Sequence, residues 1–233
     1  MDNRFLRNEM LFGKNSTDKL NGKNVAVFGV GGVGGYVAEA LARSGIGNIT
    51  VVDNDTVDIT NINRQILALE STVGLEKVDV AEKRLKDINP NCNVKKIRLF
   101  YLPENADCID LSTYDYVIDA IDTVSAKLTL IEKAKENNIP IISSMGTGNK
   151  INALMFKVAD IFDTKNDSLA RVMRTECRKR NIKSLKVVYS EEEPKIALND
   201  ENNKRIPASN AFVPPVAGFI IAGEVIKDLL CIS

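Results

Sequence analysis

The sequence of 233 residues predicts a doubly wound α/β fold built on a mainly parallel sheet. Short apolar runs alternate with amphipathic stretches of helical length, as in consecutive strand–helix–strand units. The first run, residues 23–30, is nearly continuous in apolar residues, which is typical of a strand covered on both faces. A glycine-rich segment, GVGGVG, ends this run and leads into an Ala-rich helical stretch.

The expected elements alternate regularly as far as about residue 150. The predicted strands are residues 23–30, 48–53, 92–100, 114–121 and 139–144. The predicted helices between them are residues 32–44, 74–90, 104–111 and 124–138. The later segments are strands at 153–161 and 185–190, a charged helix at 167–181, a polar loop at 191–209 and a closing helix at 216–230. We expect one domain over residues 1–233, with a core at 1–160 and a substrate-facing extension at 161–233 on the same domain.

Composition excludes several kinds of site. The chain has no histidine, and its four cysteines are scattered without a Cys-x-x-Cys pair. Common zinc sites and histidine-dependent nucleophilic catalysis are therefore not expected. Lys+Arg and Asp+Glu both number 31, so the net charge indicates no polyanionic partner by itself.

The termini and the cysteines indicate a cytoplasmic location. The leading MDNRFLRNEM has no apolar signal-peptide core, and scattered cysteines fit a reducing compartment. The apolar run at 211–223 holds two prolines and is 13 residues long, whereas a membrane span needs roughly 20. We interpret it as the start of a buried helix, with contact to a membrane surface as the alternative, and expect no stable membrane insertion.

The glycine-rich segment predicts a phosphate-binding turn. Gly29 permits a tight turn, and Gly34 lets the following helix pack close to the sheet. Gly31 and Gly32 allow backbone N–H groups to approach phosphate oxygens. Asp53, 24 residues after Gly29 at the end of the next strand, is placed to accept hydrogen bonds from ribose hydroxyls. This Rossmann-like arrangement suits NAD, FAD and ATP equally, and a plain strand-to-helix turn capped by Asp53 is the simpler alternative.

Charged residues downstream favour ATP. Asn61 and Arg64 follow the strand that ends at Asp53, and Lys77 lies near the start of the next helix. Two cations beside an acidic ribose site suit a triphosphate better than a dinucleotide. A guanidinium grips two phosphate oxygens at once, whereas an ammonium acts as a point charge. Taken alone, Arg64 is equally well explained as a solvated surface arginine.

Two carboxylates end the fourth predicted strand. Ligands of open α/β sheets bind outside the carboxyl edge, so a carboxylate there can hold Mg²⁺ against phosphates. Asp122 is the better candidate because it lies beyond the packed part of the strand. Asp119 fits an internal or capping role.

These segments together resemble a known family. GVGGVG, VVDNDTVDITNINRQ, TVGLEKVDVAEKRLKDINPNCNV and VIDAIDTVSAK are similar to segments of the ThiF/MoeB/HesA family, the ubiquitin-activating-type adenylating enzymes. The resemblance covers roughly residues 4–160 and implies a homodimer with an ATP-binding core. The ATP contacts it implies are the glycine turn, Asp53, Asn61, Arg64, Lys77 and the Mg²⁺ ligand Asp122. The leading RFLRNEMLFG is similar too, and implies that Arg7 reaches the ATP of a partner subunit.

The second half resembles one branch of this family. VADIFDTKNDSLARVMRTECRKRNIKSLKVVYSEEEP and FVPPVAGFIIAGEVIKDLL are similar to tRNA threonylcarbamoyladenosine dehydratases. That branch implies ATP-dependent activation of a threonyl carboxylate on tRNA, then ring closure with net loss of water. Catalysis would rest on Arg64, Lys77, Asp122 and Arg7.

Two alternatives remain open. The first is activation of the C-terminus of a ubiquitin-like or sulfur-carrier protein, which the absence of Cys-x-x-Cys pairs disfavours. The second is an NAD(P)-dependent oxidoreductase, which lacks an evident acid for hydride transfer because the chain has no histidine. A sulfur-relay or electron-donor protein as a further partner also stays open.

A basic stretch within the charged helix predicts RNA contact. Arg171, Arg174 and Arg178 recur at helical spacing and so share one face. The stretch continues with Lys179, Arg180, Lys183 and Lys186, against the single acid Glu176. Such a density of cations could follow RNA phosphates, with salt-sensitive affinity. An ordinary solvated helix face is the alternative.

Cys177 lies inside this basic stretch. The surrounding positive charge would favour its thiolate, which would suit a catalytic thiol. We favour the interpretation that the residue is incidental, because the ring-closing nucleophile implied by the resemblance belongs to the substrate.

Overall fold

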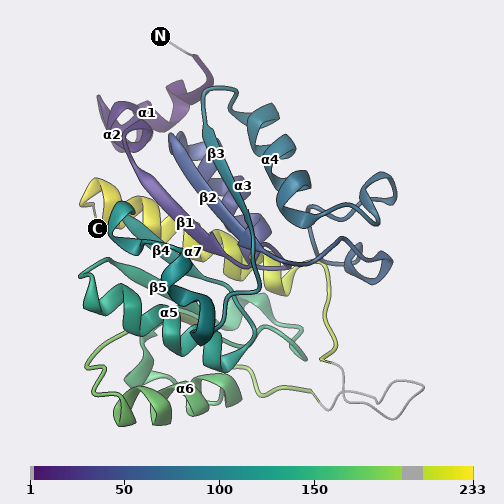
Figure 1. Ribbon diagram of the computed structural model, residues 1–233, viewed down its shortest axis with the longest axis vertical. Coiled ribbons are helices and arrows are strands. Elements are labelled where there is room, and N and C mark those ends of the chain that lie inside the picture. Colours follow the sequence, from purple (N-terminus) through teal and green to yellow (C-terminus); the bar gives the residue numbers. More distant parts are fainter. Residues whose placement is uncertain (1–2, 196–206, 233) are drawn as a thin grey trace.

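The computed structural model describes residues 3–195 and 207–232 (Figure 1). These residues form one seven-stranded sheet in the order β3-β2-β1-β4-β5-β7-β6. The strands are β1 (Asn24–Phe28), β2 (Asn48–Asp53), β3 (Asn93–Arg98), β4 (Tyr116–Asp119), β5 (Ile141–Ser144), β6 (Phe156–Asp160) and β7 (Lys186–Ser190). Every neighbouring pair is parallel except β6 and β7, which are antiparallel. The predicted mainly parallel α/β fold is confirmed.

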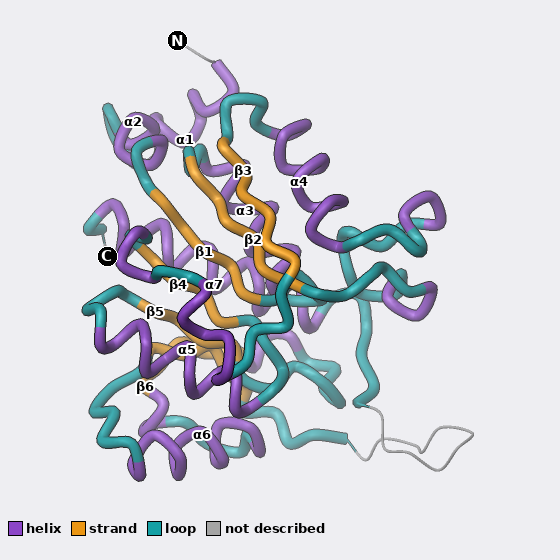
Figure 2. Tube along the Cα trace, in the orientation of Figure 1, coloured by secondary structure: helices purple, strands orange, loops and turns teal. Residues whose placement is uncertain are grey.

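Helices cover both faces of the sheet (Figure 2). They are α1 (Leu6–Phe12), α2 (Ser16–Asn21), α3 (Gly34–Ser44), α4 (Lys77–Ile88), α5 (Val124–Glu136), α6 (Ser168–Lys179) and α7 (Val213–Leu230). Along β1, Val25 and Val27 pack with α3, α4 and α7, whereas Ala26 and Phe28 pack with α5 and α6. Successive strand side chains point to opposite faces, so a strand between two helical layers must be apolar throughout.

The C-terminal extension belongs to the same sheet. The strand β7 pairs with β5, and β6 forms the edge beyond it. The prediction of an extension on the same domain therefore holds, while the division at residue 160 stays a prediction. Most of the predicted polar loop, residues 196–206, lies outside the described part of the chain.

Local details differ from the sequence-based expectation. The first helix after the glycine turn begins at Gly34 rather than residue 32. The predicted helix at 104–111 is a 3-10 helix, Pro103–Cys108. The closing helix begins at Val213, three residues before the predicted start, with prolines in its first turn. Proline is favoured there because the N–H it lacks would have no partner within the helix.

Helix α7 packs closely on α3 through a glycine. A Cβ at Gly218 would lie 2.6 Å from the Val33 carbonyl oxygen and 2.9 Å from Tyr36 Cβ. In the same helix Gly223 is exposed, and no described atom lies within 4 Å of the position of its Cβ. The two glycines thus differ only in what surrounds them.

We expect opposite effects from alanine at these two positions. Gly218→Ala should lower the free energy of unfolding by about 1–3 kcal/mol, because the added methyl overpacks the α3–α7 contact. Gly223→Ala should raise it by about 0.5–1 kcal/mol, because alanine loses less backbone entropy in a helix. Urea unfolding followed by circular dichroism measures both. Equal effects of the two variants would contradict the close packing at Gly218.

Candidate functional site

The parallel strands end at one large cleft. It has a volume of about 890 Å³ and lies at the carboxyl ends of β1, β2, β4 and β5, which is where open α/β sheets bind ligands. All but one of the residues predicted to bind nucleotide line it: Gly29, Gly31, Gly32, Asp53, Asn61, Arg64, Lys77 and Asp122. Gly34 is the exception.

The glycine turn is shaped by close backbone packing. Gly29 has φ +83°, and a Cβ there would lie 2.7 Å from the Ala120 carbonyl oxygen. A Cβ at Gly34 would lie 1.8 Å from the Gly29 carbonyl oxygen. Gly34 therefore acts beneath the cleft by letting α3 approach the turn. Gly31 and Gly32 line the cleft. A Cβ at Gly32 would lie 3.3 Å from Pro214 Cβ, whereas a Cβ at Gly31 would lie 3.7 Å from its nearest neighbour, Gln65 Nε2.

Asp53 links the glycine turn to the next strand. Its Oδ2 accepts a hydrogen bond from the Val30 N–H at 2.8 Å, and its Oδ1 accepts one from the Asp55 N–H at 2.9 Å. The residue thus has the capping role that was the simpler alternative. It also lines the cleft, and its contact with a ribose stays a prediction.

Hydrogen bonds orient the two predicted cations. Lys77 is the first residue of α4, and its Nζ lies 2.8 Å from Asp55 Oδ2. Arg64 Nη1 donates to the Thr60 carbonyl oxygen at 2.7 Å and to Asn63 Oδ1 at 2.9 Å. These contacts hold an ammonium and a guanidinium at the same cleft.

The loop that carries Arg64 begins with a reciprocal cap. The side chain of each residue, Asp58 and Asn61, accepts a hydrogen bond from the backbone N–H of the other. The Asp58 N–H donates to Asn61 Oδ1 at 3.3 Å. Asn61 is buried. Hydrogen bonds from the Thr60 hydroxyl and then the Thr60 N–H lower the pKa of Asp58, so this carboxylate stays charged at neutral pH.

Burial distinguishes Asp119, the last residue of β4, from Asp122 in the loop that follows. Asp119 is completely buried, its Oδ2 lies 2.8 Å from Lys127 Nζ, and it accepts a hydrogen bond from Ser143 Oγ. Asp122 is exposed, lines the cleft and accepts a 3.3 Å hydrogen bond from Thr123 Oγ1. Asp119 therefore has an internal role, and Asp122 is the carboxylate that a ligand in the cleft can reach.

Sequence reasoning missed several residues of the cleft. Gln65 and Tyr101 line it, and both Gln65 Oε1 and the Tyr101 hydroxyl are buried without a hydrogen-bond partner among the described residues. Burial raises the pKa of Tyr101 to about 12, so its hydroxyl remains a donor. The segment Gly146–Gly148, after β5, lines the cleft as well. The available signal was the position of Tyr101 and of Gly146–Gly148 just beyond the ends of β3 and β5, and the position of Gln65 next to Arg64.

Arg7 lies away from this cleft. It is an exposed residue of α1 and does not line the cleft of its own chain. Figure 1 shows α1 beside α2, beyond the amino end of β1, whereas the cleft lies at the carboxyl ends. Any contact of Arg7 with a nucleotide would have to involve a second subunit.

The basic residues around α6 are less free than the sequence implied. Arg174 is half-buried, and its Nη1 donates to the Thr164 carbonyl oxygen at 2.8 Å. Lys179 and Arg180 pair with Glu176, and Arg180 also pairs with Glu132. Lys186 pairs with Asp228.

Three exposed basic residues of this region form no ion pair within the described ranges. Arg178 is exposed and stacks its guanidinium 5.3 Å from the centre of the Phe162 ring. Arg171 and Lys183 are exposed and form no ion pair within the described ranges. Within the stretch predicted to contact RNA, the positive charge without an ion-pair partner is therefore on Arg171, Arg178 and Lys183.

Cys177 is buried, not an activated thiol. It is completely inaccessible to solvent, and burial raises its pKa to about 11. Loss of solvation outweighs the nearby positive charge of Arg180. The expectation that positive charge favours the thiolate is wrong, and the incidental interpretation is the better one.

The described residues include no helix that is long and apolar enough to pass through a bilayer. They also contain no cluster of three or more His, Cys, Asp or Glu side chains placed to hold a metal ion.

Comparison with known proteins identifies the family. The model of the ThiF family matches residues 5–232. The chain belongs to the ThiF family. Its sequence is 47% identical over 244 residues to the tRNA threonylcarbamoyladenosine dehydratase of Bacillus subtilis, covering 99% of this chain and 96% of that protein. It is 42% identical over 171 residues to the Escherichia coli enzyme of the same name, covering 73% of this chain and 64% of that protein.

Solved structures of the ThiF family show the same fold. The crystal structure of E. coli tRNA N6-threonylcarbamoyladenosine dehydratase, TcdA, in complex with AMP superposes with a TM-score of 0.90 at 33% identity. The match covers 98% of this chain and 94% of that chain. This agreement confirms the Rossmann-like α/β class predicted from the sequence.

Thiol reactivity tests the burial of Cys177 in this ThiF-family chain. Cys108 and Cys231 are exposed, whereas Cys92 and Cys177 are buried with pKa values raised to about 11. We expect the two exposed thiols to react with iodoacetamide at pH 8 and the two buried thiols to react only after unfolding, because the thiolate is the nucleophile. Peptide mass spectrometry identifies the labelled sites. Rapid labelling of native Cys177 would contradict this account.

Proposed function

We propose that this chain is an ATP-dependent dehydratase that adenylates the threonyl carboxylate of N6-threonylcarbamoyladenosine in tRNA and closes it into a ring. The observation that carries the proposal is the gathering of the predicted nucleotide-binding side chains on one cleft. Near full-length similarity to a B. subtilis protein of that name supports the substrate. ATP suits the cleft, since the cleft has a volume of about 890 Å³ and Gln65 and Tyr101 line it with polar atoms that have no partner among the described residues.

The chemistry proceeds in two balanced steps. First, a carboxylate oxygen of the threonyl group attacks the α-phosphorus of ATP, the bond to the β-phosphate breaks, and pyrophosphate leaves. Second, the neighbouring carbamoyl group attacks the activated acyl carbon, the bond to AMP breaks, and a proton is released. One carboxylate oxygen leaves with AMP, so the product has lost water. The nucleophile belongs to the substrate, and the protein therefore needs no cysteine or histidine.

Arg64 and Lys77 would stabilise the negative charge that moves during the first step. Both line the cleft, and both are held by hydrogen bonds to neighbours rather than left to rotate. Preorganised cations stabilise a transition state without further reorganisation. Asp53 and Asn61 would position the nucleotide from the adjoining loop.

Asp122 is the residue that would hold Mg²⁺. An exposed carboxylate in the cleft supplies one hard oxygen ligand, and phosphates with water supply the rest at typical Mg²⁺ sites. The lack of a larger acidic cluster among described residues fits such a shared site. When bound, the metal supplies positive charge next to the phosphates.

A homodimer is part of the proposal. The helix α1 exposes Leu6, Met10 and Leu11, and apolar exposure of this kind marks interaction surfaces. A second subunit seated on α1 would let Arg7 approach the ATP of its partner. A sulfur-relay or electron-donor protein also remains a proposed partner. A cytoplasmic location is proposed because the four cysteines are free thiols.

Mass analysis of nucleosides tests the reaction. The protein is incubated with ATP, Mg²⁺ and tRNA that carries threonylcarbamoyladenosine. The tRNA is then digested to nucleosides, whose masses are measured by mass spectrometry. We expect loss of one water from the modified adenosine and release of AMP. Asp122→Ala should lower the rate about a hundredfold or more, because charge neutralisation by a metal is worth several kcal/mol. Near-normal turnover would remove Asp122 as the metal ligand.

A parallel incubation tests the alternative function, activation of the C-terminus of a sulfur-carrier protein. A sulfur-carrier protein with a C-terminal Gly-Gly replaces tRNA, and formation of its acyl-adenylate is measured by mass. We expect none above background, since the chain has no Cys-x-x-Cys pair of the sulfur-carrier-activating type. Adenylation of the carrier without dehydration of tRNA would overturn the proposal in favour of the alternative.

RNA contact is tested on the basic residues open to solvent. Arg171→Glu with Lys183→Glu should weaken tRNA binding about tenfold and reduce the dependence of log Kd on log salt by about 1 for each lost phosphate contact. Arg174 is left unchanged because it bonds the Thr164 carbonyl. The matched control is Lys83→Glu with Lys95→Glu, exposed cations of α4 and β3. Equal weakening by both pairs would move the RNA site away from α6.

A further inference from the structure

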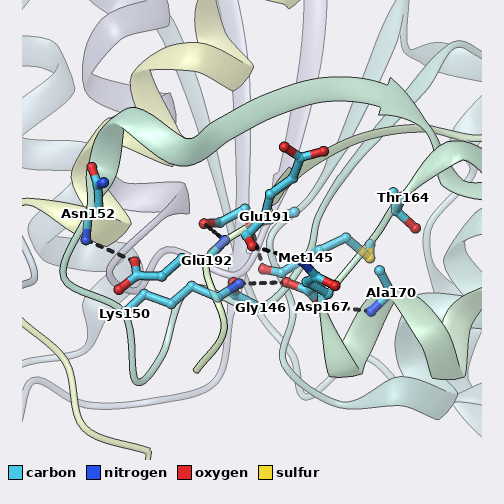
Figure 3. A network of polar contacts seen from close by, with 12 residues as sticks. Met145, Gly146, Lys150, Asn152, Thr164, Asp167, Ala170, Glu191 and Glu192 are labelled. Atoms are coloured by element: carbon cyan, nitrogen blue, oxygen red, sulfur yellow. Dashed lines mark hydrogen bonds and ion pairs between the residues drawn. The ribbon is translucent and has the colours of Figure 1, made fainter. Parts of the chain in front are cut away.

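Lys150 and Asp167 form a buried ion pair that the proposed chemistry leaves unused (Figure 3). Lys150 Nζ lies 2.7 Å from Asp167 Oδ2, and each side chain is 1% exposed. Burying two charges is costly unless their geometry is good and further hydrogen bonds satisfy them. In some proteins such a pair fixes one arrangement of the chain rather than adding stability.

Lys150 holds a segment of the cleft wall. Its Nζ also donates to the Gly146 carbonyl oxygen at 2.7 Å, four residues back along the chain. The side chain thereby closes a loop whose members Gly146, Thr147 and Gly148 line the cleft. The loop is anchored at both ends, since the Met145 N–H donates to the Val188 carbonyl oxygen and the Ala208 N–H to Asn149 Oδ1.

Asp167 holds the start of α6 with its other oxygen. Its Oδ1 accepts a hydrogen bond from the Ala170 N–H at 2.8 Å and caps the helix. Its Oδ2 is also close to the loop, 3.3 Å from where a Cβ of Gly146 would lie. Arg171 follows within the first turn of the capped helix. One carboxylate therefore connects the cleft wall to the helix proposed to bind RNA.

The position of this loop indicates which substrate it serves. The phosphate-binding turn follows β1, whereas the loop follows β5, separated from β1 by β4 in the sheet. The loop thus forms the end of the cleft away from the glycine turn, on the side of α6. A second substrate that enters beside a bound nucleotide would meet this wall.

We propose that Lys150 and Asp167 are positioning residues, which hold the Gly146–Gly148 wall and the start of α6 in one fixed relation. RNA seated on α6 would then present its carboxylate at the cleft in the correct place. This inference rests on the proposed function. Misplacement of a reacting group by about 1 Å can cost about a hundredfold in rate, so a change in this relation should be visible in turnover.

Two variants test the Lys150–Asp167 pair, and a third serves as the control. Lys150→Met removes the charge and both hydrogen bonds of Nζ, and Asp167→Asn keeps an oxygen that can cap α6. The matched control is Glu39→Gln, whose side chain is 5% exposed and pairs with Arg84 at 2.6 Å on the α3–α4 side of the fold. For each variant we would measure kcat and KM for tRNA, Kd for ATP, and the unfolding midpoint.

We expect Lys150→Met and Asp167→Asn to lower kcat with tRNA about tenfold or more, with Kd for ATP within about threefold. Glu39→Gln should keep kcat within about twofold despite a similar fall in the unfolding midpoint. If Lys150→Met does not fold, Asp167→Asn carries the test. Unchanged kcat, an equal loss in Glu39→Gln, or full recovery at saturating ATP would overturn the positioning role. Wild-type protein that fails to dehydrate tRNA would instead overturn the proposed function and the inference with it.

Discussion

The close approach of helix α3 to the end of β1 is the constraint on which the cleft depends. Gly34 packs on the Gly29 carbonyl, and Gly29 packs on the Ala120 carbonyl, at distances that leave no space for a Cβ. Since this turn is so tight, the Val30 N–H reaches the carboxylate of Asp53 at 2.8 Å. Backbone packing of Gly29 on Ala120 and the Asp53 carboxylate together connect the ends of β1, β2 and β4, and the charged residues of the cleft lie along that edge.

Burial decides what each acidic residue near the cleft does. Asp119 and Asp167 are almost completely inaccessible and are each paired with a buried lysine. Because a buried unpaired charge is very costly, these two carboxylates are committed to structure. Asp122 lies on the exposed side of the same region and keeps its oxygens available to a ligand. The same carboxylate group thus stabilises the interior at Asp119 and Asp167 and faces the cleft at Asp122.

The cleft combines parts from distant segments of the chain. The segments up to the end of β4 and the loop after it contribute the glycine turn, the two cations and Asp122, while the segment after β5 supplies the wall held by Lys150. Asn210, which caps the start of α7, also donates to the Lys150 carbonyl oxygen at 2.8 Å. The nucleotide-facing and α6-facing sides are thereby tied to one network.

The sequence by itself determined the alternation of strands and helices, the glycine turn after β1 and eight of the residues that line the cleft, because these depend on local periodicity and on the ends of consecutive strands. Tertiary structure decided the antiparallel placement of β6, the buried state of Cys177 and the pairing of Arg174, Lys179 and Arg180. It also brought Gln65, Tyr101 and the Gly146–Gly148 loop to the cleft. These features depend on neighbours far apart in the chain, and loss of solvation is a property of packing that no local pattern encodes.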